Sequence, residues 1–336
     1  MNEFAGLDGH KASVFACVKD EFSGKVLREQ NYPTHAIGME KLYQTVRNAK
    51  CVIEASTACY LIYDYLKDRG VDIIVAHPKR VKAISSAKLK TDKVDARILA
   101  DLRRANLVPE AHIPSKDVRD KRDVVRQHIS LTQQHTRLVN QTKAALSRYG
   151  LKLPKNIFTK KALKIADATQ MPESLRLKLS HARQQHELLK KELNETDSRI
   201  KKLAEESRDA VLLSSIRGVG SFLSLGIVLQ IDGVKRFPTP EHLISYAGLC
   251  PCVKQSGDSY WAGKISHDAC STLSWMFIQA AWSVVFFQPY FKEMYSKLCK
   301  KKKPQKAIVI VAKRLARAIY FMLRDQTTFH PNGGGC

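Results

Sequence analysis

Two aspartates three residues apart are the first candidates for chemistry in this sequence. Asp92 and Asp95 stand in residues 88–102, a stretch without Gly or Pro in which Thr91 is a good N-cap residue, so the pattern predicts a helix. Side chains three positions apart share one face of a helix, and Leu99 continues the same stripe. We therefore expect the two carboxylates to point where the leucine points, toward the interior.

Carboxylates placed in this way repel each other unless they are protonated or bound to a cation. Hard oxygen ligands suit Mg²⁺ or Mn²⁺. The alternative is the start of a surface helix, where acidic residues interact favourably with the helix dipole. The choice between the two interpretations depends on where the other acidic residues fall.

The elements that position these acids form an alternating pattern. Three strands, a helix, a strand, a helix, a strand and a final helix are predicted in residues 4–7, 14–18, 25–30, 34–48, 51–53, 58–69, 71–76 and 88–102. Asp8 ends the first strand and Glu54 ends the fourth. Ligand sites in α/β sheets gather at the carboxyl ends of strands, so the four carboxylates could converge there.

Taken singly, Asp8 reads as a turn residue and Glu54 as an acid that precedes a helix. All four acids together favour a site that holds two metal ions against a phosphodiester. The arrangement resembles the RNase-H-like fold of the RuvC type.

Composition narrows the class of protein. The 336 residues are 44% hydrophobic and 26% charged, which describes a globular chain of two or three domains. The net charge of +24 predicts a polyanionic partner, with nucleic acid first and an anionic membrane surface second. The most apolar run, residues 273–287, is shorter than the roughly 20 residues that a spanning helix needs.

The sequence also gives an expectation for the compartment. Residues 1–4 lack the basic and apolar regions of a signal peptide. The eight cysteines are scattered along the chain. A zinc site usually needs two closely spaced pairs of ligands, and only Cys250 and Cys252 form such a pair, so a zinc site is not expected. We expect free thiols in the cytoplasm and no membrane partner.

The middle region, residues 115–210, predicts two long helices. In the second, apolar and small side chains recur four and three positions apart from Leu175 to Leu203, which is an a/d seam. The pattern predicts either an antiparallel helical hairpin or an intermolecular coiled coil. His186 and Thr196 interrupt the seam as polar positions that set its register.

A glycine turn opens the third region. Arg217, Gly218 and Gly220 precede an apolar helix at residues 222–230, an arrangement that resembles the turn of helix-hairpin-helix modules. In such modules the glycines let backbone N–H groups approach a DNA phosphate.

A serine among lysines is the second candidate for chemistry. Ser256 stands in a turn close in sequence to Lys254 and Lys264, and local positive charge could activate its hydroxyl toward a phosphate. From these residues alone an ordinary turn serine is the favoured interpretation. Further on, residues 269–287 predict a buried helix and residues 305–324 a basic amphipathic helix.

Six motifs carry a family resemblance: GLDGHK at 6–11, VIEAS at 52–56, KTDKVDA at 90–96, IRGVG at 216–220, YAGLCP at 246–251 and QSG at 255–257. In this order they resemble the DEDD transposases of the IS110 group of insertion sequences, relatives of the pilin-gene-inverting recombinases. The resemblance covers nearly the whole chain, to about residue 325.

The resemblance implies a RuvC-like metal-binding domain at 1–114, a coiled coil at 115–210, a mainly helical transposase domain at 211–326 and a disordered tail at 327–336. It implies that Asp8, Glu54, Asp92 and Asp95 hold Mg²⁺ or Mn²⁺ and that Ser256 forms a covalent phosphoserine link to DNA. The implied partners are donor and target DNA, a structured bridge RNA, and further copies of the chain in a dimer or tetramer joined by the coiled coil.

Ten residues are the candidates for nucleic-acid contacts: Lys11, Lys90, Lys93, Arg217, Gly218, Gly220, Lys254, Lys264, Lys313 and Arg314. Two alternatives remain for the function. One is a metal-dependent, junction-resolving nuclease in which water is the nucleophile, and the other is a nucleic-acid-binding protein without catalytic activity.

Overall fold

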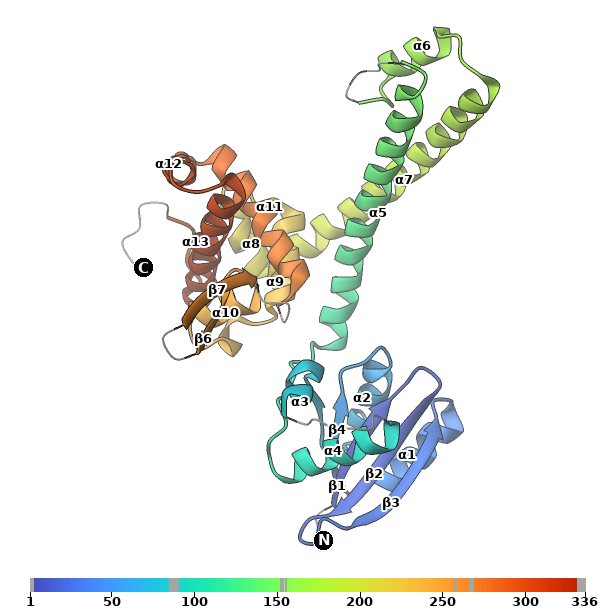
Figure 1. Ribbon diagram of the computed structural model, residues 1–336, viewed down its shortest axis with the longest axis vertical. Coiled ribbons are helices and arrows are strands. Elements are labelled where there is room, and N and C mark those ends of the chain that lie inside the picture. Colours follow the sequence, from blue (N-terminus) through green and yellow to red (C-terminus); the bar gives the residue numbers. More distant parts are fainter. Residues whose placement is uncertain are drawn as a thin grey trace. The chain divides into compact units, whose positions relative to one another are not determined.

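A computed structural model describes residues 3–84, 91–151, 154, 156–256, 259–265 and 269–330 (Figure 1). The chain divides into two compact units, Met1–Ile113 and Pro114–Cys336. Each unit is described by itself below.

The first unit is built on one mixed sheet. Its elements are β1 (Glu3–Gly9), β2 (Ser13–Asp20), β3 (Val26–Pro33), α1 (Ala36–Val46), β4 (Ala49–Glu54), α2 (Cys59–Lys67), β5 (Ile73–Ala76), α3 (Pro78–Ile84) and α4 (Asp92–Arg104). The strand order is β3-β2-β1-β4-β5, with β1 antiparallel to β2 and parallel to β4. The predicted α/β class is confirmed, and the arrangement is compatible with an RNase-H-like fold. The short helix α3 was not predicted.

Helices cover both faces of this sheet. Met39 and Leu42 of α1 and Ile62 of α2 pack in one cluster with buried residues of β1, β2 and β4. On the other face, Leu99 and Leu102 of α4 pack with residues that include Val52 of β4. Burial on both faces gives the sheet a core on each side, which holds its strand ends in fixed positions.

Strand β1 sends alternate side chains to these two cores. Ala5 and Leu7 belong to the cluster on the α1 and α2 side. Because successive side chains in a strand point to opposite faces, Gly6 and Asp8 face α4. The same alternation in β4, with Ile53 in the α1 and α2 cluster, turns Glu54 toward the α4 side.

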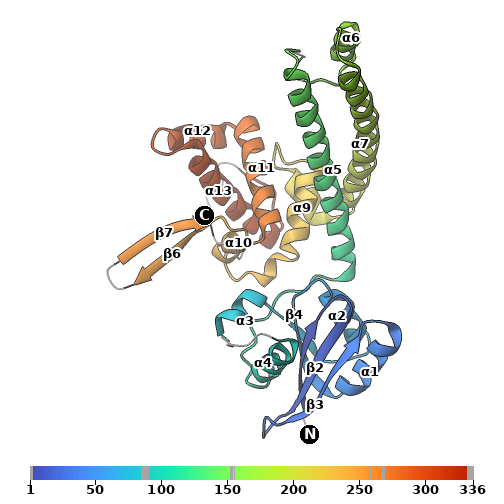
Figure 2. The ribbon, with the colours of Figure 1, turned by 45° about the vertical axis from the view of Figure 1, so that its right-hand side comes forward.

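The second unit is mainly helical. Its elements are α5 (Lys116–Ser147), α6 (Lys160–Ala168), α7 (Glu173–Glu205), α8 (Arg208–Ser214), α9 (Ser221–Ile231), a 3-10 turn η1 (Val234–Arg236), α10 (Pro240–Tyr246), β6 (Pro251–Ser256), β7 (Ser259–Ile265), α11 (Ser271–Phe287), α12 (Pro289–Cys299) and α13 (Pro304–Asp325). Strands β6 and β7 form an antiparallel hairpin that extends away from the helices of this unit (Figure 2).

The two long helices α5 and α7 pack side by side in opposite directions. Near one end, Leu146 of α5 clusters with Leu175 of α7. In the middle, Nε2 of His135 lies 2.9 Å from Nδ1 of His186. The chain therefore forms the antiparallel hairpin, one of the two arrangements predicted, and an intermolecular coiled coil stays a prediction.

Helices α9, α11 and α13 supply much of the core of the second unit, with Phe277, Val311 and Leu315 among its buried residues. The prediction of a buried helix at 269–287 is wrong for one face of α11. Trp282 is 44% exposed and Phe286 is 78% exposed.

Two further predictions concern the ends of the chain and membranes. The ring of Phe329, in the predicted disordered tail, lies 5.9 Å from that of Phe291, whereas residues 331–336 lie outside the described residues. Within the described part of the chain, no helix is both long and apolar enough to cross a bilayer.

Candidate metal centre

Helix α4 lies directly against strand β1 because Gly6 has no side chain. A Cβ atom on Gly6 would lie 2.0 Å from the backbone oxygen of Ala96 and 2.5 Å from the nitrogen of Ala100. Both atoms belong to the backbone of α4 and cannot move aside on their own. The glycine therefore sets the distance between the helix that carries Asp92 and Asp95 and the strand that carries Asp8.

Ion pairs fix α4 across the neighbouring strands. The ammonium of Lys19 on β2 donates to the carboxylate of Asp101 at 2.6 Å. Glu29 on β3 accepts hydrogen bonds from both Arg97 Nε and Arg97 Nη2, the latter at 2.9 Å, and pairs with Lys93 at 3.0 Å. Hydrogen bonds from Arg97, followed by those from Lys93, lower the pKa of Glu29 to about 2.

The first turn of α4 brings Asp92 to the end of β1. Thr91 caps the helix, and its hydroxyl accepts a hydrogen bond from the N–H of Val94 at 3.3 Å, as the sequence predicts. Asp92 is the first residue of the helix, and its side chain is 56% exposed. Asp95 is half-buried one turn later.

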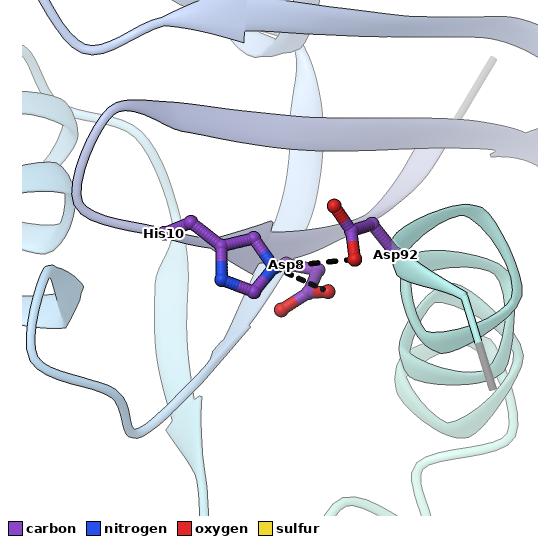
Figure 3. A group of neighbouring side chains, drawn as sticks. All are labelled: Asp8, His10 and Asp92. Carbon is purple, nitrogen blue, oxygen red and sulfur yellow. Dashed lines mark ion pairs between the residues drawn. The ribbon is translucent and has the colours of Figure 1, made fainter.

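Asp8, His10 and Asp92 form a compact group (Figure 3). Nε2 of His10 lies 3.4 Å from Oδ2 of Asp8 and 3.3 Å from Oδ1 of Asp92, so the imidazole stands between the two carboxylates. One potential ligand atom from each residue lies within 4.8 Å of the other two. Asp8 is buried at 9% exposure, whereas His10 and Asp92 are open to solvent.

The carboxyl of Asp8 has a raised pKa, first because burial disfavours its charged form. The negative charges of Asp92 and Asp95 raise the pKa further, and His10 opposes them. Asp92 and Asp95 of α4 thus act electrostatically on Asp8. This is the repulsion that a bound cation would relieve.

Glu54 ends the strand next to β1. Leu7 of β1 pairs with Ile53 of β4 in parallel register, so one step further along the ladder Asp8 stands opposite Glu54. Ser56, just beyond, donates its hydroxyl hydrogen to the backbone oxygen of Gly9 at 2.8 Å. The loop after Glu54 is thereby tied to the end of β1.

The structure thus brings Asp8, His10 and Asp92 together at the end of β1. Asp95 and Glu54 lie outside this group, although the charge of Asp95 acts on Asp8 and Glu54 ends the neighbouring strand. Carboxylate oxygens are the ligands that suit Mg²⁺ or Mn²⁺, whereas an imidazole nitrogen is more typical of zinc or iron sites. Asp8 supplies a buried, repelled carboxylate and Asp92 an accessible one, so the residues present fit a divalent ion that solvent and a phosphate can reach. Their roles as ligands stay a prediction.

Sequence reasoning did not include His10 among the site residues. Its signal was its place two residues after Asp8 in the motif Gly9-His10-Lys11. Because β1 ends at Gly9, His10 falls in the turn to β2, where its backbone N–H donates to Ser13 O at 2.7 Å. That turn returns the ring toward the strand end.

The lysines of the first unit that are predicted to contact nucleic acid differ in their exposure and in whether their charge is paired. Lys11 is exposed in the turn between β1 and β2. Lys93 is also exposed, but its charge is paired with Glu29. Lys90 lies outside the described residues.

The glycine turn of the second unit joins α8 to α9. Gly218 has a φ of +104°, and a Cβ there would lie 3.1 Å from Phe287 Cδ2 and 3.1 Å from Ser283 O. Gly220 is the N-cap of α9, and a Cβ there would meet no atom within 4 Å. The turn is thus packed on α11 at one glycine and open at the other, with Arg217 exposed between α8 and α9.

The second candidate for chemistry lies at the tip of the β6–β7 hairpin. Ser256 is the last residue of β6 and pairs with Ser259 of β7. Its hydroxyl and the side chains of Lys254 and Lys264 lie outside what the structure describes. On α13, Arg314 is exposed and Lys313 is half-buried.

Family models match both units. The model named DEDD_Tnp_IS110, described as Transposase, matches residues 5–151. A second, described as Transposase IS116/IS110/IS902 family, matches residues 210–296. The first match contains Asp8, Glu54, Asp92 and Asp95, and the second contains Ser256.

Curated relatives agree with these matches. The transposase for insertion sequence element IS1533 of Leptospira borgpetersenii is 29% identical over 133 residues, which are 38% of this chain and 38% of that protein. The putative transposase y4rJ of Sinorhizobium fredii is 24% identical, and the match covers 93% of this chain and 85% of the relative. The transposase for IS1111A of Coxiella burnetii is 23% identical over 96% of this chain and 90% of its own length. The chain spans 57% of another relative, the putative transposase y4qE of Sinorhizobium fredii.

Proposed function

Because this chain belongs to the IS110-type transposases, we propose that it is an enzyme that cuts and rejoins DNA strands when an insertion sequence moves. The observation that carries the proposal is the convergence of Asp8, His10 and Asp92 at the end of β1 (Figure 3). In a chain with a net charge of +24, such an acidic group calls for a specific explanation.

Asp8, Glu54, Asp92 and Asp95 would hold Mg²⁺ or Mn²⁺, with the imidazole of His10 beside Asp8 and Asp92. When bound, the metal neutralises charge on the oxygens of the scissile phosphate. The protein's own part is to keep these carboxylates at a fixed spacing, which Gly6 and the ion pairs of α4 do.

Ser256 is the proposed nucleophile. Its oxygen attacks the phosphorus and loses its proton, and the bond from the phosphorus to one deoxyribose oxygen breaks, so that this oxygen leaves as a hydroxyl. In the reverse sense a DNA hydroxyl attacks the phosphoserine and the serine regains its proton. The phosphodiester energy is conserved, so rejoining needs no ATP.

Support for this role comes from the family match over residues 210–296 and from the place of Ser256 at a hairpin tip. The test is peptide mapping of a denatured protein–DNA adduct formed on a suicide substrate. Attachment at Ser256 is expected, and Ser256→Ala should form no adduct whereas Ser259→Ala should still form one. Metal-dependent cleavage without any adduct would instead indicate a junction-resolving nuclease. Binding without cleavage would indicate a catalytically inactive binding protein.

A structured bridge RNA and further copies of the chain are the proposed partners besides donor and target DNA. Sequencing of the RNA that copurifies with the protein tests the first. For the second, Leu189 and Leu193 of α7 are half-buried although they lie on the seam with α5, so the hairpin leaves apolar surface for another copy. Leu193→Glu should lower the mass measured by light scattering. An unchanged mass would mean that the copies of the chain associate through another surface.

A further inference from the structure

Helix α11 exposes a continuous uncharged stripe. Ser271, Trp275, Gln279, Trp282 and Phe286 follow one another at spacings of four, four, three and four residues, and all are exposed. Side chains at this spacing lie on one face of a helix. Trp275 is 41%, Trp282 44% and Phe286 78% exposed, whereas Leu273, Phe277 and Val284 on the opposite face are fully buried. We call Trp275, Trp282 and Phe286 the aromatic stripe.

Each ring of the aromatic stripe is supported by a neighbouring ring. Trp275 meets Phe222 of α9 edge-on at 6.1 Å, and Trp282 meets Tyr295 of α12 edge-on at 5.5 Å. Phe286 contacts Phe287 at 4.9 Å. The stripe is thus a row of positioned rings that remain open to solvent, and exposed apolar side chains gathered on one face are typical of an interaction site.

Lysines border the aromatic stripe. Tyr295 ties α12 to Trp282, and the segment 288–306, which contains α12, carries seven lysines and one acid. The lysines are Lys292, Lys297, Lys300, Lys301, Lys302, Lys303 and Lys306, all exposed. The acid, Glu293, pairs with Lys297 at 2.7 Å. A strong positive potential therefore lies beside an uncharged aromatic row.

The glycine turn also lies at the Phe286 end of the row, where segment 288–306 begins. Gln288 Nε2 donates to the backbone oxygen of Arg217 at 3.1 Å, and Gly218 packs against Phe287. The exposed Arg217 is thereby held at the Phe286 end of the aromatic stripe. Segment 288–306 begins beyond the same end, so both sets of cations border the rings there.

The combination of open rings and cations selects a partner. In duplex DNA the bases are stacked inside and cannot reach rings on a convex helix, whereas unpaired bases stack on aromatic side chains while cations hold the phosphates. A second copy of the chain would bring an equally basic surface to the stripe, and like charges oppose such an interface.

We propose that Trp275, Trp282 and Phe286 form a stacking platform for the unpaired bases of a single-stranded nucleic acid, whose phosphates are held by the lysines of segment 288–306. This assigns a surface for unpaired strands to the proposed function and rests on it. The test below measures binding alone, so a failure of strand cleavage and a failure of the platform are separate results.

The experiment uses the full-length protein and fluorescein-labelled 20-nucleotide single strands of RNA and of DNA, with a 20-base-pair duplex of the same sequence as reference. Trp282→Ala should weaken binding of a single strand by about 5- to 100-fold, the usual effect of losing one stacked ring. Binding of the duplex should change by less than about twofold. The strand that loses more affinity, RNA or DNA, identifies the natural ligand.

Two variants control for indirect effects. Trp282→Phe keeps an aromatic face and should keep most of the affinity. Tyr149→Ala removes another exposed aromatic residue of the same unit, 52% exposed after the end of α5, and should change nothing. Circular dichroism checks that each variant is folded, and for a misfolded Trp282→Ala the variant Phe286→Ala takes its place.

Tryptophan fluorescence gives a direct second measurement. The chain has three tryptophans, and Trp261→Phe leaves only the two in the aromatic stripe. Stacking of an unpaired strand should quench their emission, and the duplex should not. Equal loss of single-strand and duplex binding in Trp282→Ala would overturn the platform. Unchanged single-strand binding in Trp282→Ala would also overturn it. If that variant lost binding to phosphatidylserine vesicles, the stripe would be a membrane contact. If it had a lower mass in light scattering, the stripe would be a contact between copies of the chain.

Discussion

The two units of the chain treat charge in opposite ways. Residues 1–113 carry 18 Lys and Arg against 14 Asp and Glu, a net charge of +4, and residues 114–336 carry 38 against 18, a net charge of +20. In the first unit, acidic side chains gather at the end of β1. The helix that carries Asp92 is held in place by ion pairs, such as the one between Glu29 and Arg97. In the second unit many cations are exposed and spread along helices, as in segment 288–306.

This difference matches two different physical needs. A site that positions metal ions needs a few charges at fixed distances, and a rigid two-faced sheet supplies them. Binding to a nucleic-acid backbone needs many cations but tolerates their motion, because each phosphate contact contributes mainly by releasing counterions. The comparison predicts that variants of the acidic group in the first unit affect chemistry, whereas variants of the exposed cations in the second unit affect affinity.

The largest effect is expected at the acidic group. Asp8→Asn and Asp92→Asn each remove one charge from the proposed metal site, so strand cleavage in Mg²⁺ should fall by more than the roughly 10–100-fold that outer-shell partners of a metal contribute. Affinity for DNA should stay within about twofold, because the cations of the second unit are untouched. Gel assays of cleavage and binding on one substrate measure both.

Glu40→Gln is the matched control, since Glu40 is an exposed carboxylate on α1, across the sheet from α4. Asp8→Asn should also be at least as stable as the wild type in urea at pH 7, because the raised pKa of Asp8 means that its charge opposes folding. Near-normal cleavage by either aspartate variant would refute the metal centre.

The next largest effect is expected on the stability of the first unit. In Gly6→Ala the added methyl group would overlap the backbone of α4, and forced overpacking costs about 1–3 kcal/mol or more. Urea unfolding should show this loss, and cleavage should fall with it as Asp92 moves away from Asp8. Gly220→Ala, where the methyl group meets nothing within 4 Å, should leave stability nearly unchanged. Equal stability of the two variants would mean that α4 docks less tightly than described.

A smaller effect is expected on the salt dependence of binding. Replacement of the four lysines 300–303 by Gln should reduce the slope of log K against log salt by up to about four phosphate contacts. Fluorescence anisotropy with duplex DNA between low and physiological salt measures it. Replacement of four exposed lysines of the first unit, Lys25, Lys41, Lys50 and Lys67, should change the slope less. The reverse result would place the DNA-binding surface on the first unit and break the comparison.

The smallest effect concerns acid stability. The folded-state pKa of Glu29, about 2, is below its ordinary value of 4.5, so its pairing with Arg97 stabilises the first unit above pH 4.5 and is lost as the pH falls toward 2. Glu29→Gln should therefore flatten the loss of stability across this window. Urea midpoints of both proteins at pH 7, 4 and 3 test the expectation, and parallel curves would contradict it.

Local patterns predicted most of the first unit, because strand alternation and the Thr91 cap are short-range signals. The close approach at Gly6 was not predictable, because it depends on α4 returning to a strand some 90 residues earlier. His10 was passed over since its role depends on the direction of a turn.

In the second unit, a helix without charged residues was read as buried. The sequence of α11 cannot indicate which apolar face lacks a neighbour, and Trp282 and Phe286 are exposed because the core of this unit covers the opposite side. The role of the Ser256 hydroxyl as nucleophile is a prediction that rests on the family resemblance.

The distance along the chain between Asp8 and Asp92 has a consequence for the newly made protein. The hairpin of β1 and β2 can form as soon as it leaves the ribosome, but the acidic group does not exist until α4, ending at Arg104, has been synthesised and has docked on Gly6. Contacts so far apart in sequence form late in folding. The electrostatic repulsion of the carboxylates is therefore deferred until the sheet has formed, and a chain that ends before α4 lacks the acidic group that the proposed strand cleavage needs.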